Sequence, residues 1–188
     1  MEIVTGLLSS FGLSSAAGLN AYLPLLIVGL LQRFGVLHFP DSYALLSNTW
    51  VLLGIAAVGA LDFVGDKIPG IDHALHIFGG IVNAAAGAIL FASHSGLTHL
   101  SPSVSLLLGF AVAASVQMGR TALRPVSTAM TAGLGNPVVS AAEDGTSLGL
   151  TLSALFAPLL SGLLMLALLY LAWRVWQRRP GRGSPSAL

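Results

Sequence analysis

The stretch that decides the fold is SSAAGLNAYLP, residues 14–24, where glycine, asparagine and proline interrupt an apolar run. No charged residue lies between Glu2 and Arg33. We therefore expect two helical segments, of about 3–16 and 22–33, with the first too short to span a membrane. Unpaired backbone groups cost several kcal/mol in lipid, so such a break persists only where protein or trapped water satisfies it.

The composition identifies lipid as the main solvent of this chain. Among 188 residues, eight are Lys or Arg and seven are Asp or Glu, against 55% hydrophobic residues. An ordinary soluble domain has about a quarter of its residues charged. Further apolar runs cover residues 50–65, 75–91, 104–123 and 148–173. Because a helix needs about 20 apolar residues to cross a bilayer, we predict an all-α polytopic membrane protein with about five transmembrane spans.

A second polar interruption lies near the other end of the chain, at STAMTAGLGNPVVS, residues 127–140. Both interruptions have small hydroxyl residues, then Gly-Leu, then Asn, then Pro. This order predicts two broken or re-entrant helical segments, and their placement is compatible with an inverted repeat. Chance recurrence in so apolar a chain is the alternative.

Charged residues within the apolar region occur in pairs one helical turn apart. Asp62 and Asp66 form one pair, and Arg120 and Arg124 form the other. Residues at i and i+4 share one face of a helix. One interpretation is a set of structural salt bridges or of charges at the membrane interface. The other is that the two arginines bind an anionic group such as phosphate or carboxylate.

Two further acids follow the second interruption. Together with Asn136 and Ser140, the oxygens of Glu143 and Asp144 would suit Na⁺ or a proton relay, and Asn20 would line the same site. The alternative is an exposed turn in which residues 144–147 cap a long final helix.

Small residues recur at every fourth position in two of the apolar runs. Such stripes let a neighbouring backbone approach closely, either within the chain or in a homo-oligomer, which we predict. The stripes are Gly145, Gly149, Ser153, Ala157 and Ser161, and Gly79, Asn83 and Gly87.

Three motifs carry a resemblance to a known family. They are AGLNAYLPL (residues 17–25), DKIPGID (66–72) and GLGNPVVS (133–140) followed by Glu143-Asp144. With them the chain resembles the bacterial membrane-protein family known as domain of unknown function 4126. The resemblance covers nearly the whole apolar region and implies no activity and no binding residues.

These observations predict a single transmembrane domain, residues 1–176, and a disordered cytoplasmic tail, 177–188, in a bacterial cytoplasmic (inner) membrane. The four arginines near the C-terminus place that end in the cytoplasm. We predict a small secondary transporter or flippase-like carrier for a small polar or anionic solute, coupled to H⁺ or Na⁺. The alternatives are a membrane scaffold and an enzyme acting on a lipid-linked phosphate. The chain lacks catalytic and phosphate-binding fingerprints, cysteines and a basic stripe, so we predict no cofactor, metal or nucleic-acid partner.

Overall fold

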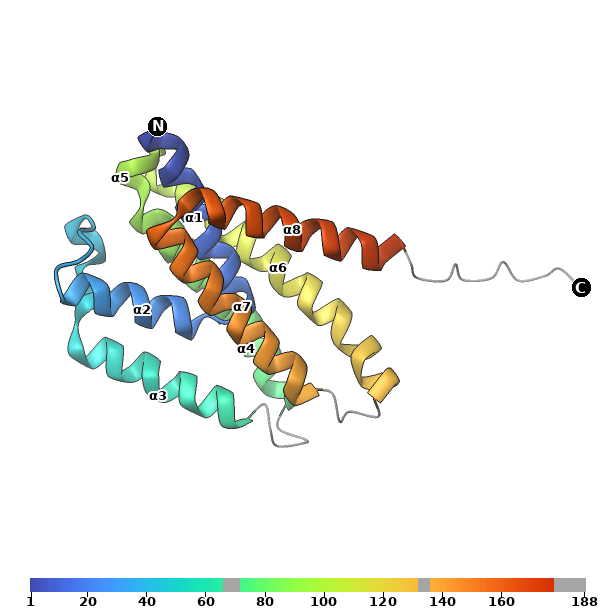
Figure 1. Cartoon of the computed structure of the whole chain (residues 1–188). Coiled ribbons are helices and arrows are strands. Elements are labelled where there is room, and N and C mark those ends of the chain that lie inside the picture. Colours follow the sequence, from blue (N-terminus) through green and yellow to red (C-terminus); the bar gives the residue numbers. More distant parts are fainter. Residues whose placement is uncertain (66–71, 132–135, 178–188) are drawn as a thin grey trace, which may run out of the picture.

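The fold is seen in a computed structural model that describes residues 1–65, 72–131 and 136–177. Every element in these ranges is helical, as the sequence predicts (Figure 1). The elements are α1 (Glu2–Leu19), α2 (Tyr22–Arg33), the 3-10 helix η1 (Asp41–Ser47), α3 (Thr49–Gly65), α4 (Asp72–Ser93), α5 (Ser95–Thr98), α6 (Pro102–Thr131), α7 (Asn136–Phe156) and α8 (Pro158–Gln177).

Helix α1 is the centre of the structure, because it packs against α4, α6, α7 and α8. Its buried residues are almost all Gly, Ala or Ser, which let four helices approach one axis. Gly18 shows how close this approach is, since a Cβ added there would lie 2.6 Å from the carbonyl oxygen of Ala113 on α6. Any larger residue at position 18 would separate α1 from α6.

Helices α4 and α6 cross at a second close contact. A Cβ added to Gly87 on α4 would lie 2.9 Å from the carbonyl oxygen of Gly109 on α6. Ser14 on α1 donates a hydrogen bond to the Gly87 carbonyl at 2.9 Å, and the rings of Phe11 and Phe91 meet edge to face with centroids 5.2 Å apart. The predicted stripe on α4 is therefore a packing surface within the monomer at Gly87.

The last apolar run is two helices, and not the single span expected for residues 148–173. Helix α7 ends at Phe156 and α8 begins at Pro158. Proline has no N–H to donate to the Ala154 carbonyl, and its ring crowds that carbonyl. Ser9 on α1 donates to the same oxygen at 2.7 Å, so α1 satisfies the group that the proline leaves free.

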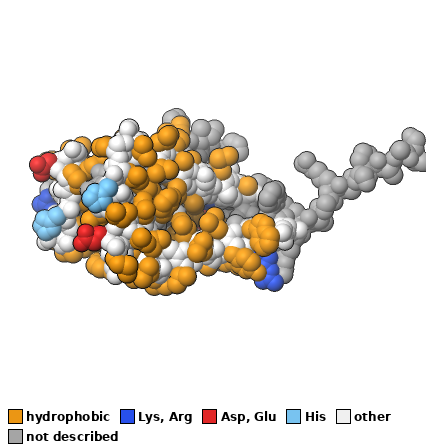
Figure 2. Space-filling model, turned by 90° about the horizontal axis from the view of Figure 1, so that it is seen from above, with side chains coloured by type: hydrophobic (Ala, Val, Ile, Leu, Met, Phe, Trp, Pro, Cys, Tyr) orange, Lys and Arg blue, Asp and Glu red, His pale blue; other side chains and the backbone are white. Residues whose placement is uncertain are grey.

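The outer surface of the described residues is strongly apolar. Leu107 on α6 and Leu163, Leu166 and Leu169 on α8 are among many exposed large hydrophobic side chains. Figure 2 shows hydrophobic side chains across the middle of one face, with charged residues and histidine toward one end and a Lys or Arg at the other. This distribution is that of a membrane protein, as the composition predicts.

The described residues do not confirm the number of spans that the sequence predicts. Among the described residues, α1 and the Pro102–Ala122 part of α6 are long and apolar enough to cross a membrane, and η1 with α3, bent by 57°, makes a third if the pair is one span. A count of about five is not confirmed, because a helix such as the 12-residue α2 is only about 18 Å long. The expectation that the first segment is too short was wrong, since α1 continues to Leu19.

The two interruptions of the sequence differ in their extent. The first is confined to Asn20 and Ala21, because the preceding serines are helical. At the second, the irregular backbone expected from residue 127 is helical to Thr131, and α7 begins at Asn136. Residues 132–135 lie outside the described residues, as does the tail from residue 178. An inverted repeat is not confirmed.

Candidate functional site

The candidate site surrounds the break between α1 and α2. Asn20 leaves the helical conformation, with φ −149° and ψ 117°, and so turns the chain out of α1. Its side-chain Oδ1 then accepts hydrogen bonds from the N–H groups of Tyr22 (2.9 Å) and Leu23 (3.3 Å) at the start of α2. Pro24 needs no partner because it has no N–H, and it is tolerated in a first helical turn. One asparagine therefore both ends α1 and caps α2.

Helices α4 and α7 also supply hydrogen bonds to backbone groups at the break. Asn83 on α4 accepts from the N–H of Ala21 (3.2 Å) through Oδ1 and donates to the Gly18 carbonyl (3.4 Å) through Nδ2. Ser147 on α7 donates to the carbonyls of Ala16 (3.0 Å) and Asn20 (3.4 Å). Unpaired, each of these groups would cost about 1–3 kcal/mol where it is buried.

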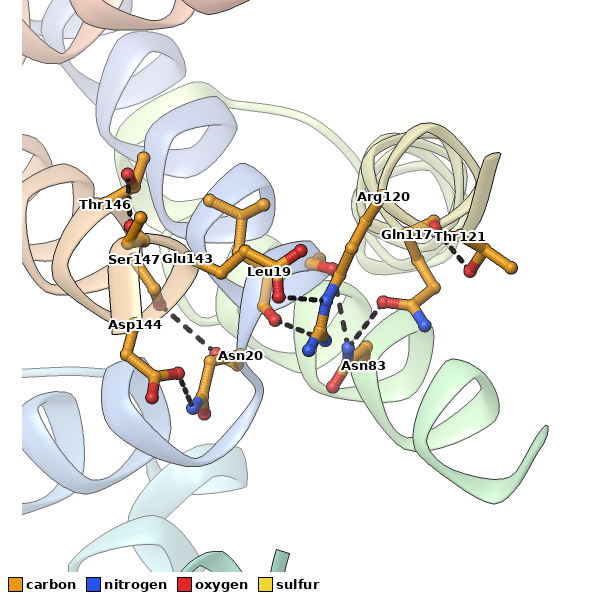
Figure 3. Close-up of polar contacts among 12 residues, drawn as sticks. Leu19, Asn20, Asn83, Gln117, Arg120, Thr121, Glu143, Asp144, Thr146 and Ser147 are labelled. Carbon is orange, nitrogen blue, oxygen red and sulfur yellow. Dashed lines mark hydrogen bonds and ion pairs between the residues drawn. The ribbon is translucent and has the colours of Figure 1, made fainter. Parts of the chain in front are cut away.

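Arg120 on α6 is the positive charge of the site. One of its terminal nitrogens donates to the Leu19 carbonyl at the end of α1 (2.8 Å), where the helix dipole is negative. Its Nε donates to Oε2 of Glu143 on α7 at 2.7 Å, as an ion pair whose side chains are 12% and 13% exposed. The guanidinium thus joins α1, α6 and α7 (Figure 3).

Glu143 and Asp144 are consecutive residues of α7 and contact different partners. Asp144 accepts a hydrogen bond from the side-chain amide of Asn20 at 2.8 Å, next to the pairing of Glu143 with Arg120 (Figure 3). Both acids lie within a helix, so the alternative of an exposed turn that caps a later helix was wrong. When all three are ionised, Arg120, Glu143 and Asp144 carry one more negative than positive charge.

The structure brings together Asn20, Arg120, Glu143 and Asp144 from the predicted set of site residues. Ser140 is half-buried on α7, one turn before Asp144, and Asp62 is half-buried on α3. The backbone of Arg124 continues α6 one turn beyond Arg120, and Asn136 is the first residue of α7. The side chains of Arg124 and Asn136 and the whole of Asp66 lie outside the described residues.

Three residues of the site were not among the predicted ones. Asn83, Gln117 and Ser147 are all buried, and Gln117 on α6 accepts from Asn83 Nδ2 at 2.8 Å. Gln117 is an amide within the apolar run 104–123, and such a residue in lipid needs a hydrogen-bond partner on another helix. That was the available signal, but a single sequence does not tell which helix supplies the partner.

Comparison with protein-family models gives a match that covers the site. The model described as "Domain of unknown function (DUF4126)" matches residues 7–178. The chain belongs to this family. The matched region includes every residue of the site, from the end of α1 to Ser147 on α7. Neither the curated proteins nor the solved structures contain a match.

Membership of the DUF4126 family confirms the resemblance that the three sequence motifs indicated. The family description names no ligand and no reaction, so it assigns no role to Asn20, Arg120 or the two acids. A function must be argued from the chemistry of the site.

Proposed function

We propose that this DUF4126 protein is a small secondary transporter that moves a small anionic solute together with a proton. The observation that supports the proposal most is the position of the helix break. A cap residue at the end of α1, an ion pair between α6 and α7, and a second carboxylate on α7 converge where α1 stops being helical. Broken helices beside ionisable residues are how secondary transporters build their binding sites.

The residues divide into two chemical roles in this proposal. Arg120 would bind the anion, because a guanidinium keeps its charge and has several donors in a fixed plane. Arg124, Asn136 and Ser140, on the same two helices, would complete the anion site. Glu143 and Asp144 would carry the proton, with Asp62 and Asp66 on the path toward α3.

The contacts at the break favour a proton over Na⁺ as the coupling ion. The carbonyl oxygens of Gly18, Leu19 and Asn20, which could otherwise be Na⁺ ligands, already accept hydrogen bonds from Asn83, Arg120 and Ser147. The guanidinium of Arg120 lies against the negative end of α1, where a cation ligand would otherwise bind. A carboxylate that takes up a proton needs no such set of ligands.

The proposal extends to the topology. We place the protein in a bacterial cytoplasmic membrane with about five spans and the C-terminus in the cytoplasm, and we include a homo-oligomer in the proposal. Arg174, at the end of α8, and the arginines that follow it support this orientation by the positive-inside rule. The helix break at Asn20 supports a re-entrant or broken segment.

Reconstituted vesicles test the proposal. The purified chain would be inserted into liposomes that contain a pH-sensitive dye, and small carboxylate, sulfonate and phosphate anions would be added outside. Anion-dependent acidification of the interior is expected, and Arg120→Ala or Asn20→Ala should abolish it. Arg33→Ala is the matched control, since Arg33 is exposed at the far end of α2.

Two results would contradict transport. One is the absence of protein-dependent acidification for the whole set of anions. The other is equal flux in the wild type and both site variants. Size-exclusion chromatography of each variant separates a loss of flux from a loss of folding.

A non-transporting membrane scaffold is the second candidate, and one observation favours it. The break is satisfied by side chains of the protein itself, so it is stable without any ligand. On this alternative, Asn20 and Arg120 have a structural role. A substitution of either residue should then weaken partner binding only as far as it lowers the stability of the fold. Flux that disappears in a variant of unchanged stability would exclude the scaffold.

A further inference from the structure

We propose that Glu143 occupies the anion site on Arg120 as an internal substitute for the substrate, and that its protonation releases the guanidinium to an incoming monoanion. The inference rests on the proposed function and specifies its coupling. On this inference the substrate is a monoanion of the carboxylate, sulfonate or phosphodiester class. One proton binds to the protein together with each anion.

The geometry of the ion pair carries the first step. Glu143 contacts Arg120 at Nε, at 2.7 Å, while another guanidinium nitrogen is held by the Leu19 carbonyl. The backbone contact fixes the plane of the guanidinium independently of the acid. A different oxyanion that replaces Glu143 would therefore meet an already oriented donor.

The burial of the pair carries the second step. At 12% and 13% exposure, both side chains are largely but not completely buried. Removal of one partner from such a pair leaves a charge that water compensates only in part. An anion that displaced an ionised Glu143 would add a second negative charge next to that carboxylate. If Glu143 takes up a proton as it leaves, the charge of the site is the same before and after exchange.

Other ionisable groups lie on Glu143's own helix and on the helices around it. Asp144 is its neighbour on α7 and is held by Asn20. Arg120 and Arg124 lie on α6, Tyr22 on α2, Asp62 on α3, and Asp72, His73 and His76 at the start of α4, while Glu2 on α1, Arg33 on α2 and Arg174 on α8 lie near the ends of their helices. Glu143 is the acid that forms an ion pair with the guanidinium of Arg120, so a proton on Glu143 and an anion on Arg120 act on the same ion pair.

The test is a binding measurement on the full chain in detergent. The probes are methanesulfonate and dimethyl phosphate, which stay singly charged from pH 5 to pH 8, and binding is followed by thermal stabilisation at constant ionic strength. Because one proton is taken up with each anion, the apparent affinity of the wild type should fall as the pH is raised, by up to about tenfold for each pH unit. In weakly buffered solution, binding should take up about one proton per site.

The variant Glu143→Gln should bind with the same affinity at every pH and take up no proton. Arg120→Gln should bind neither probe, and Arg120→Lys, which keeps the charge, should bind more weakly than the wild type. Glu2→Gln, the same change at an exposed glutamate, should behave as the wild type. Binding of methanesulfonate supports a soluble substrate, and binding of dimethyl phosphate alone supports a phosphodiester head group.

The inference is overturned if neither probe binds, if wild type and Glu143→Gln show the same pH dependence, or if Asp144→Asn removes the proton uptake while Glu143→Gln retains it. These outcomes are distinct from failure of the proposed function. Proton-linked binding without flux in vesicles would contradict transport only. Anion flux with pH-independent binding would contradict only the exchange at Glu143.

Discussion

Nε of Arg120 donates to Oε2 of Glu143 at 2.7 Å, and this contact connects α6 to α7 beside the point where α1 ends. The same guanidinium holds the last carbonyl of α1, at Leu19. One side chain therefore couples the helix break to two neighbouring helices. The ion pair with Glu143 and the hydrogen bond to the break thus share one guanidinium.

The first prediction concerns the stability of the ion pair. Glu143→Leu should destabilise the fold by about 2–3 kcal/mol, because Arg120 is left partly buried without its acid. The double variant Arg120→Met/Glu143→Leu should recover part of this loss, since no unpaired charge remains. Thermal unfolding in detergent measures both values. If the loss in the double variant equals the sum of the losses in the two single variants, the ion pair itself does not contribute to stability.

The second prediction compares two asparagines that make the same kind of cap. Asn48 accepts from the N–H of Trp50 at 2.9 Å and is exposed, whereas Asn20 accepts from two N–H groups within the helical core. Asn48→Ala should cost about 1 kcal/mol, as exposed caps do. Asn20→Ala should cost about 2–4 kcal/mol, because water cannot replace its bonds so easily. Equal losses in thermal unfolding would mean that water reaches the break.

The third prediction concerns the bend between α7 and α8. Ser9→Ala should cost about 1–2 kcal/mol by leaving the Ala154 carbonyl unpaired. Pro158→Ala restores an N–H that can donate to this same carbonyl, so the cost of Ser9→Ala should be smaller in that background. Ser115→Ala is the control, because Ser115 is exposed and donates to a carbonyl of its own helix, at Ala111. A cost of Ser9→Ala that is independent of Pro158 would contradict this account.

The fourth prediction is a pH dependence of stability from His94, in the turn after α4. Burial lowers the pKa of His94 to about 4, although its bond to the Leu90 carbonyl acts in the opposite direction. The ring also packs edge-on against Phe39, with centroids 4.9 Å apart. Between pH 6.5 and 4, the unfolded chain therefore takes up a proton that the folded chain does not.

The contribution of His94 to the free energy of unfolding should thus be constant above about pH 7. It should fall as the pH decreases, by about 3 kcal/mol at pH 4. His94→Gln should flatten that part of the profile in thermal unfolding between pH 7.5 and 4.5. His99→Gln, at an exposed histidine, should leave the slope unchanged. A wild-type slope that persists in His94→Gln would assign the effect to the carboxylates.

Much of the architecture follows from local sequence. The charge-poor composition predicts helices in lipid, because lipid offers backbone groups no alternative partners. Asn20 and Pro24 predict the break, because an asparagine side chain can cap the start of a helix and proline has no backbone N–H. Pro158 is an equally strong local signal for a helix break, but the length of the apolar run around it favoured a single span. The predicted number of spans is not confirmed, since hydropathy does not register where a helix bends.

The sequence by itself determined the solvent, the helical class, the family and the break at Asn20, since each depends on composition or on residues within a few positions of one another. Only the tertiary structure decided that Arg120 pairs with Glu143, that Asn83 and Ser147 satisfy the break, and that Ser9 reaches Ala154. These contacts join residues that are distant in the chain. Their partners are selected by the close packing of small residues around α1, which no local pattern specifies.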